Sequence, residues 1–103
     1  MQLTTCIAII FLVLAAPRPV VADQCSDQGV WLQVLGSGGP ELTDRRASTG
    51  YLVWQDGRAR VLVDLGSGTL LQFEKSGARF EDLEYVLLTH LHVDHSVDLP
   101  AII

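Results

Sequence analysis

Close to its C-terminal end the chain carries a cluster of metal-ligating residue types, and this cluster most restricts what the chain can fold into. All three histidines of the 103 residues fall here with an aspartate, as His90, His92, Asp94 and His95. The apolar run 83–88 comes directly before them and predicts a short buried strand. Side chains two apart on a strand point the same way, so we expect His90 and His92 to aim at one place, with Asp94 in the same parity.

Imidazole nitrogens and a carboxylate oxygen together are typical of a metal site. These ligand types are spaced closely enough to divide between two adjacent ions. The alternative is a chance cluster of ordinary core or surface histidines. Burying such groups without partners would cost about 1–3 kcal/mol each, so the pattern favours metal binding.

Residues 89–95, Thr-His-Leu-His-Val-Asp-His, resemble the His-x-His-x-Asp-His signature of the metallo-β-lactamase superfamily. The continuation 95–100 is most similar to the branch that holds ribonuclease Z, arylsulfatase-like and cyclic-nucleotide phosphodiesterase-like hydrolases. Asp98 departs from the glycine often found at that point in ribonuclease Z-like proteins. The resemblance extends from about residue 30 to residue 103.

The resemblance implies an α+β fold, the N-terminal half of an αββα sandwich with a mostly antiparallel sheet and flanking helices. It implies that His90 and His92 hold one ion, and that Asp94 and His95 hold a second. Zinc is the expected metal, with iron or manganese as alternatives. The implied activity is hydrolysis of a phosphodiester, sulfate ester or related substrate by metal-bound hydroxide, with Asp94 as the catalytic residue that orients it.

Asp64 closes a predicted strand and is followed by glycines, so its carboxylate needs a partner. One interpretation is a loop cap that binds nearby backbone N–H groups. The other follows from the resemblance, because Asp64 matches the Asp-x-Gly motif of the superfamily. There the carboxylate lies just outside the metal shell and steadies the ligand loop, and we favour this interpretation.

On the substrate side, Arg45 and Arg46 are candidates for contact with an anion, since guanidinium pairs well with phosphate or sulfate. A solvated loop is the alternative. The turn 36–40 does not fit a nucleotide-binding Gly-x-Gly-x-x-Gly pattern; it resembles the turn that forms one rim of the active site in ribonuclease Z-like proteins. The formal net charge of −5, without a basic patch, predicts a small anionic ester as substrate and no nucleic-acid partner.

The remaining pattern predicts strands at 29–35, 51–54 and 59–63, the last two joined by a hairpin at Asp56-Gly57. A short helix is expected at 69–75, capped by Ser67 or Thr69 and ended by Gly77. A further helix should open after residue 95.

Residues 1–22 read as a signal peptide, which predicts a periplasmic or secreted protein. The apolar run 7–16 is shorter than the roughly 20 residues of a membrane span, although an uncleaved anchor is the alternative. Cleavage would remove Cys6, leave Cys25 as a lone thiol, and end any membrane association. The oligomeric state stays open.

Residues 23–103 are then expected to be a truncated metallo-β-lactamase-like domain, because the sheet lacks a second half and no further histidine completes the metal shell. A piece of this size would expose a large apolar surface and be inactive alone. The alternative function is a truncated or degenerate, non-catalytic chain that retains part of a metal site. Export argues against a role in transfer-RNA processing.

Overall fold

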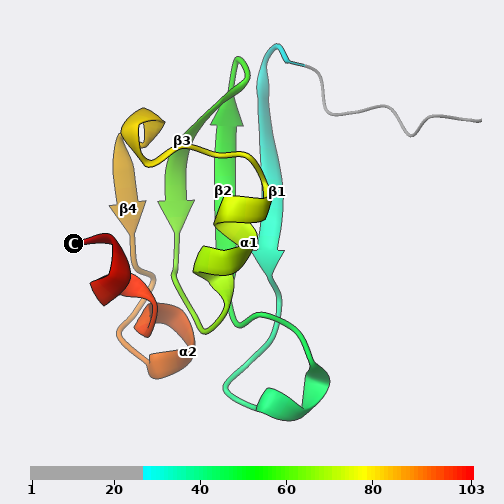
Figure 1. Ribbon diagram of the computed structural model, residues 1–103, viewed down its shortest axis with the longest axis vertical. Coiled ribbons are helices and arrows are strands. Elements are labelled where there is room, and N and C mark those ends of the chain that lie inside the picture. Colours follow the sequence, from blue (N-terminus) through cyan, green and yellow to red (C-terminus); the bar gives the residue numbers. More distant parts are fainter. Residues whose placement is uncertain (1–26) are drawn as a thin grey trace, which may run out of the picture.

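The computed structural model describes residues 27–103, so the predicted signal peptide and Cys25 lie outside the described residues. Figure 1 shows a single mixed sheet with short helices beside it. Its strands follow the order of the chain: β1 (Val30–Gly36), β2 (Gly50–Gln55), β3 (Arg58–Val63) and β4 (Tyr85–Leu87). The helices are α1 (Thr69–Lys75) and α2 (Val93–Ser96), with 3-10 turns η1 (Leu42–Asp44), η2 (Phe80–Asp82) and η3 (Leu99–Ile102). Within this part of the chain no helix has the length and apolar character needed to cross a membrane.

The first three strands form an antiparallel meander, as the sequence predicts. Asp56 and Gly57 connect β2 to β3 with φ of 49° and 75°. Positive φ at both positions is the conformation of a two-residue turn that matches strand twist. The predicted hairpin is therefore confirmed.

The fourth strand pairs with β3 in parallel. A parallel neighbour cannot be reached by a tight turn and needs a crossover, which α1 and η2 provide. Because of this crossover, β4 runs in the same direction as β1 and β3. The C-terminal ends of these three strands therefore lie on the same side of the sheet, where α2 also lies (Figure 1).

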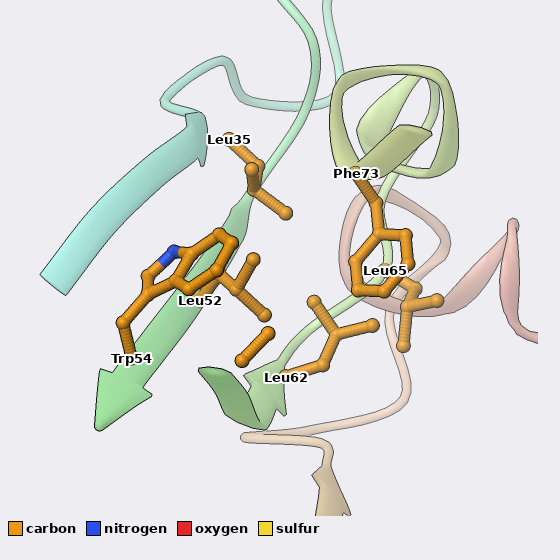
Figure 2. Close-up of a cluster of buried hydrophobic side chains, with 7 residues drawn as sticks. Leu35, Leu52, Trp54, Leu62, Leu65 and Phe73 are labelled. Carbon is orange, nitrogen blue, oxygen red and sulfur yellow. The ribbon is translucent and has the colours of Figure 1, made fainter. Parts of the chain in front are cut away.

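One face of the sheet packs against α1 and forms the core (Figure 2). Alternate strand residues point to this face, and Phe73 of α1 closes over them at 1% exposure. The buried cluster consists of Leu35, Leu52, Trp54, Ala59, Leu62, Leu65 and Phe73.

The opposite face of the sheet is apolar and largely uncovered, and we call it the open face. The strand register places on it Val30, Leu32, Val34, Tyr51, Val53, Val61, Val63, Tyr85 and Leu87. Leu32 is 59% exposed and Tyr85 61%. The predicted exposed apolar surface is thus present, and it suits the inner face of a two-sheet sandwich.

Two local predictions are wrong. Residues 83–88 were expected to be a buried strand, but β4 spans only Tyr85–Leu87 and all of it is exposed, because it is the edge strand and lies outside the cover of α1. Neither Ser67 nor Thr69 caps α1; Gly68 is the N-cap and has no side chain to do so. The Thr69 hydroxyl donates instead to the carbonyl of Ser48 at 3.1 Å.

Candidate metal centre

The candidate site lies at the C-terminal ends of β3 and β4. Asp64 directly follows β3 in the left-handed region, at φ 60°, and is 1% exposed. Its Oδ1 accepts the Thr89 backbone N–H at 2.7 Å, and its Oδ2 accepts the Thr89 hydroxyl at 2.8 Å. His95 Nδ1 also lies 2.8 Å from Oδ2. The Asp64 carboxylate therefore joins both ends of the segment that carries the histidines.

These contacts decide the ionisation of Asp64. Burial on its own would raise the pKa of the carboxyl. Hydrogen bonds from His95 and from the backbone and hydroxyl of Thr89 together outweigh burial, so the pKa lies below its usual value. An ionised carboxylate can only accept, so His95 carries its proton on Nδ1 and presents Nε2 to the site.

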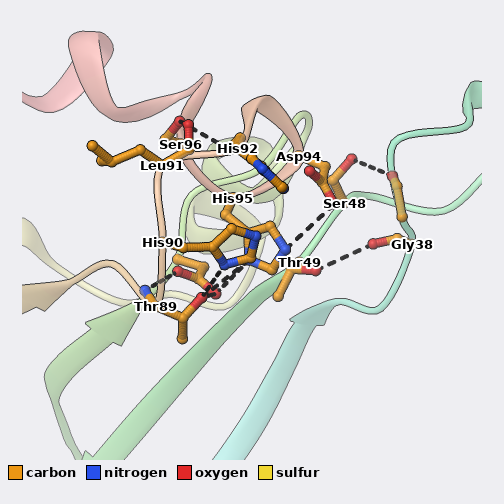
Figure 3. A network of polar contacts seen from close by, with 12 residues as sticks. Gly38, Ser48, Thr49, Thr89, His90, Leu91, His92, Asp94, His95 and Ser96 are labelled. Atoms are coloured by element: carbon orange, nitrogen blue, oxygen red, sulfur yellow. Dashed lines mark hydrogen bonds and ion pairs between the residues drawn. The ribbon is translucent and has the colours of Figure 1, made fainter.

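The three imidazoles gather in one place (Figure 3). The ring centroid of His90 is 4.5 Å from that of His92 and 4.0 Å from that of His95. His92 is not on an extended strand, since it is the N-cap of α2. The strand parity used in the prediction therefore does not apply at this position, yet the predicted proximity of His90 and His92 is found.

Asp94 lies against the free nitrogen of His95, with 3.3 Å between Asp94 Oδ2 and His95 Nε2. With the Nδ1 proton directed at Asp64, Nε2 and Asp94 Oδ2 are both acceptors, so they cannot hydrogen-bond to each other and a cation between them would satisfy both. Ligands at about 2.0–2.2 Å from one zinc ion lie roughly 3–3.5 Å apart. The pair therefore fits two positions of a metal shell.

The site is not a complete shell. In residues 27–103 no set of three or more His, Cys, Asp or Glu side chains is arranged so that it could hold a metal ion. The donor types suit a divalent cation, but these residues supply only part of its coordination. The assignment of His90 and His92 to one ion, and of Asp94 and His95 to another, stays a prediction.

Gly66 allows the ligand segment to approach the end of β3. A Cβ at this position would clash with the Asp94 carbonyl oxygen and lie 2.5 Å from Ser48 Cβ. Only glycine lets the chain after β3 come this close to the Asp94 carbonyl and the Ser48 side chain. The close contact therefore explains why glycine stands at the last position of the Asp-x-Gly motif, which the sequence pattern did not show.

A cavity of about 270 Å³ opens beside Asp94, lined by Pro40, Ser48, Ser67, Val93, Asp94 and Val97. Of these residues, only Asp94 was a candidate from the sequence. Pro40 belongs to the turn that was expected to form a rim of the site. Ser48 and Ser67 come from small-residue stretches next to strand ends; the sequence singled out Ser67 only as a possible helix cap and Ser48 not at all.

The two arginines differ in their surroundings. Arg46 Nη2 lies 3.1 Å from Asp44 Oδ2, and Arg46 Nη1 lies 3.5 Å from the Ser37 hydroxyl. The backbone N–H of Arg46, and then its guanidinium, hold the pKa of Asp44 below its usual value despite partial desolvation. Arg45 is exposed and has φ 57°. Anion binding by either residue remains a prediction.

Comparison with known proteins extends the geometric evidence. Ribonuclease Z of Thermobifida fusca (strain YX) is 42% identical over 72 residues, which cover 70% of this chain and 22% of that protein. The structure of the metallo-beta-lactamase fold protein YhfI from Bacillus subtilis has a TM-score of 0.61 at 30% identity, covering 71% of this chain and 30% of that one. Human tRNase Z, short form, has a TM-score of 0.60 at 30% identity, covering 69% and 27%.

These relatives contradict the predicted partners. The prediction of a small ester substrate and no nucleic acid conflicts with relatives named for ribonuclease and tRNase activity. The net charge of −5 belongs to a chain that spans about a fifth of the length of the curated relatives it matches. The net charge of a short segment describes that segment and not the field of a whole protein.

The match to a family model is broader than any single motif. Residues 43–103, more than half of the chain, match the model described as the metallo-beta-lactamase superfamily. This segment contains the turn after β3, residues 89–95, which we call the histidine loop, and the rest of α2. The four-stranded sheet with α1 on one face and the open face on the other is the corresponding half of the αββα sandwich. The chain belongs to the metallo-β-lactamase superfamily.

Proposed function

We propose that the full-length protein is a metal-dependent hydrolase that cleaves phosphodiester bonds in RNA. The names of the relatives support this substrate class. Membership of the superfamily supports divalent metal binding, and we propose zinc as the ion because the candidate ligands are imidazole and carboxylate.

In this proposal His90, His92, Asp94 and His95 contribute metal ligands. Bound ions would supply a water of lowered pKa as nucleophile and neutralise charge on the phosphate. Asp94 orients that water, and Asp64 fixes the tautomer and direction of His95. The exposed Arg45 is the better candidate for a phosphate contact, because Arg46 is already paired with Asp44.

One observation carries the proposal: the buried Asp64 carboxylate binds Thr89 and His95 together. Metal-binding histidines commonly donate their second nitrogen to a carboxylate, which fixes the tautomer. A histidine held in this way, with Nε2 facing another carboxylate, suits a ligand better than an ordinary surface histidine.

The test compares wild-type full-length protein with His92→Ala and with the exposed α1 variant Glu74→Ala as control. Metal content is measured by elemental analysis, and cleavage of a labelled RNA oligonucleotide by gel electrophoresis. We expect wild type and Glu74→Ala to bind zinc and cleave, and His92→Ala to lose both. Unchanged metal content and cleavage in His92→Ala would contradict the proposal.

We also propose that the protein is exported, on the basis of the apolar run 7–16. N-terminal sequencing of protein recovered outside the cytoplasm should then start at Asp23. Leu12→Arg, which interrupts the run, should retain the protein inside the cell. Recovery of a protein whose first residue is still Met1 would count against export.

A further inference from the structure

Asp98 performs a task that neither the motif nor the proposed function assigns to it. It lies between α2 and η3, four positions after Asp94. Its Oδ2 accepts the backbone N–H of Leu70 at 3.1 Å, across 28 residues of sequence. Leu70 is in the first turn of α1, where backbone N–H groups have no partner within the helix.

The helix cannot provide this contact for itself. Its N-cap is Gly68, which has no side chain. An N-cap side chain ordinarily accepts from the second or third helical N–H, and Leu70 is the second residue of α1. Asp98 therefore caps α1 from a distant part of the chain.

The backbone around Asp98 is fixed to the same region. The Asp98 N–H donates to the Leu65 carbonyl at 2.9 Å, and the Leu65 N–H donates to the His95 carbonyl at 2.7 Å. Leu65 itself is fully buried in the core. Residues 95 and 98 are thus hydrogen-bonded to the N–H and the carbonyl of one buried residue, and the Asp98 carboxylate adds a third attachment on α1.

These attachments matter because α2 has only four residues. A single helical turn is not stable alone and takes its position from its contacts. Asp94 and His95 both lie in this turn, and α1 is anchored by the buried Phe73.

We propose that Asp98 is a positioning residue: by capping α1 across the chain, it holds the α2 turn so that Asp94 and His95 face the metal centre. This inference rests on the proposed role of those two residues as ligands. Asp98 itself binds no metal in this scheme and acts through the position of α2.

The experiment uses the full-length protein with Asp98→Ala, Asp98→Asn and the control Asp82→Ala. Asn keeps an oxygen acceptor of the same reach, whereas Ala removes it. Asp82 lies in η2, away from the site, and its carboxylate accepts no hydrogen bond within residues 27–103. Readouts are zinc affinity by chelator competition, the visible spectrum of the cobalt-substituted protein, and the Tm of the metal-free protein.

We expect Asp98→Ala to lower zinc affinity by about 10-fold or more, the range seen when partners of metal ligands are removed, and to alter the cobalt spectrum. Asp98→Asn should restore both, and Asp82→Ala should leave both unchanged. If Asp98→Ala lowers only the Tm, with affinity and spectrum as in wild type, Asp98 is merely structural and the inference is overturned. An Asp98→Asn protein as impaired as Asp98→Ala would overturn it too.

Should Asp98→Ala fail to fold, Asp98→Ser takes its place, because the shorter hydroxyl falls one bond short of Leu70 and preserves a polar surface. Its zinc affinity should fall as for Ala, and wild-type affinity would overturn the inference. If the wild-type protein binds zinc and cleaves RNA, and the Asp98 variants bind zinc equally well, only the positioning role is overturned. Wild-type protein that binds no zinc would overturn the proposed function, and the positioning role with it.

Discussion

At the scale of single residues, the site depends on the Asp64 carboxylate, which is not among the proposed metal ligands. Asp64 is buried and accepts three hydrogen bonds, from donors 25 and 31 residues further along the chain. A buried acceptor with this many donors fixes each of them in direction, because moving any one leaves a polar group unpaired. The histidine loop is therefore positioned by the residue that directly follows β3.

Replacing Asp64 with Asn tests this arrangement with little change of volume. The amide has one oxygen in place of two, and its NH₂ group would face a donor, so either Thr89 or His95 loses its partner. We expect zinc affinity of the full-length protein to fall by about 10–100-fold. Chelator competition measures this, with Glu74→Gln on the exposed side of α1 as control. Equal affinities in the two variants would show that Asp64 does not support the ligands.

Gly66→Ala tests the close approach of the two backbones. The added methyl would meet the Asp94 carbonyl, and the clash cannot be relieved by a side-chain rotation. We expect the free energy of unfolding to fall by about 3 kcal/mol or more, at or above the upper end of the range typical of overpacking. Zinc binding should weaken as well. Gly39→Ala is the control, since its methyl would meet only the flexible end of Glu41. Chemical unfolding that gives the same stability for both variants would contradict this prediction.

At the scale of elements, the sequence predicts what depends on neighbouring residues. The strands, the Asp56-Gly57 turn and the extent of α1 are local patterns, and the structure has them. The cap of α1 was wrong because its acceptor, Asp98, lies 28 residues away. The burial of β4 was wrong because an edge position depends on the whole sheet and not on the apolar run itself.

The same limit applies to the site. The histidine cluster could be recognised because its members are adjacent in sequence. Ser48, Ser67 and Pro40 join Asp94 around the cavity only through the fold, and no spacing rule connects them. Asp98 appeared in the sequence only as a departure from a glycine, and its contact with Leu70 gives that departure a physical reason.

The packing of α1 on the sheet can be tested within the helix. Phe73 is buried in the core, whereas Leu71 is 52% exposed. Phe73→Ala should destabilise the full-length protein by about 3–5 kcal/mol, because it removes apolar contacts and leaves a cavity. Leu71→Ala should cost much less. Urea unfolding of the two variants gives the comparison, and similar losses would mean that α1 does not anchor on this face.

At the scale of the whole molecule, the open face decides how this part of the chain behaves. An apolar surface that crosses all the strands favours contact with another apolar layer. In the αββα sandwich that layer is the second sheet. The open face is therefore the inner face of the sheet in such a sandwich, and the face covered by α1 is the outer one.

Leu32→Glu should have opposite effects in two settings. Segment 27–103 expressed alone should become more soluble, because a charge interrupts the open face. The full-length protein should lose stability, because the same charge would be buried against the second sheet. Light scattering and thermal unfolding measure the two effects, and Leu71→Glu on α1 is the control. A gain of stability in the full-length protein would contradict the sandwich packing.

The parallel pairing of β4 has a consequence for the order in which the chain acquires its structure. The hairpins of β1, β2 and β3 join near neighbours, whereas β4 can pair only after the intervening crossover has closed, and non-local pairings form slowly. The histidine loop is attached to the end of this last strand. The proposed metal ligands follow this last strand, so we expect tight cation binding only after β4 has paired.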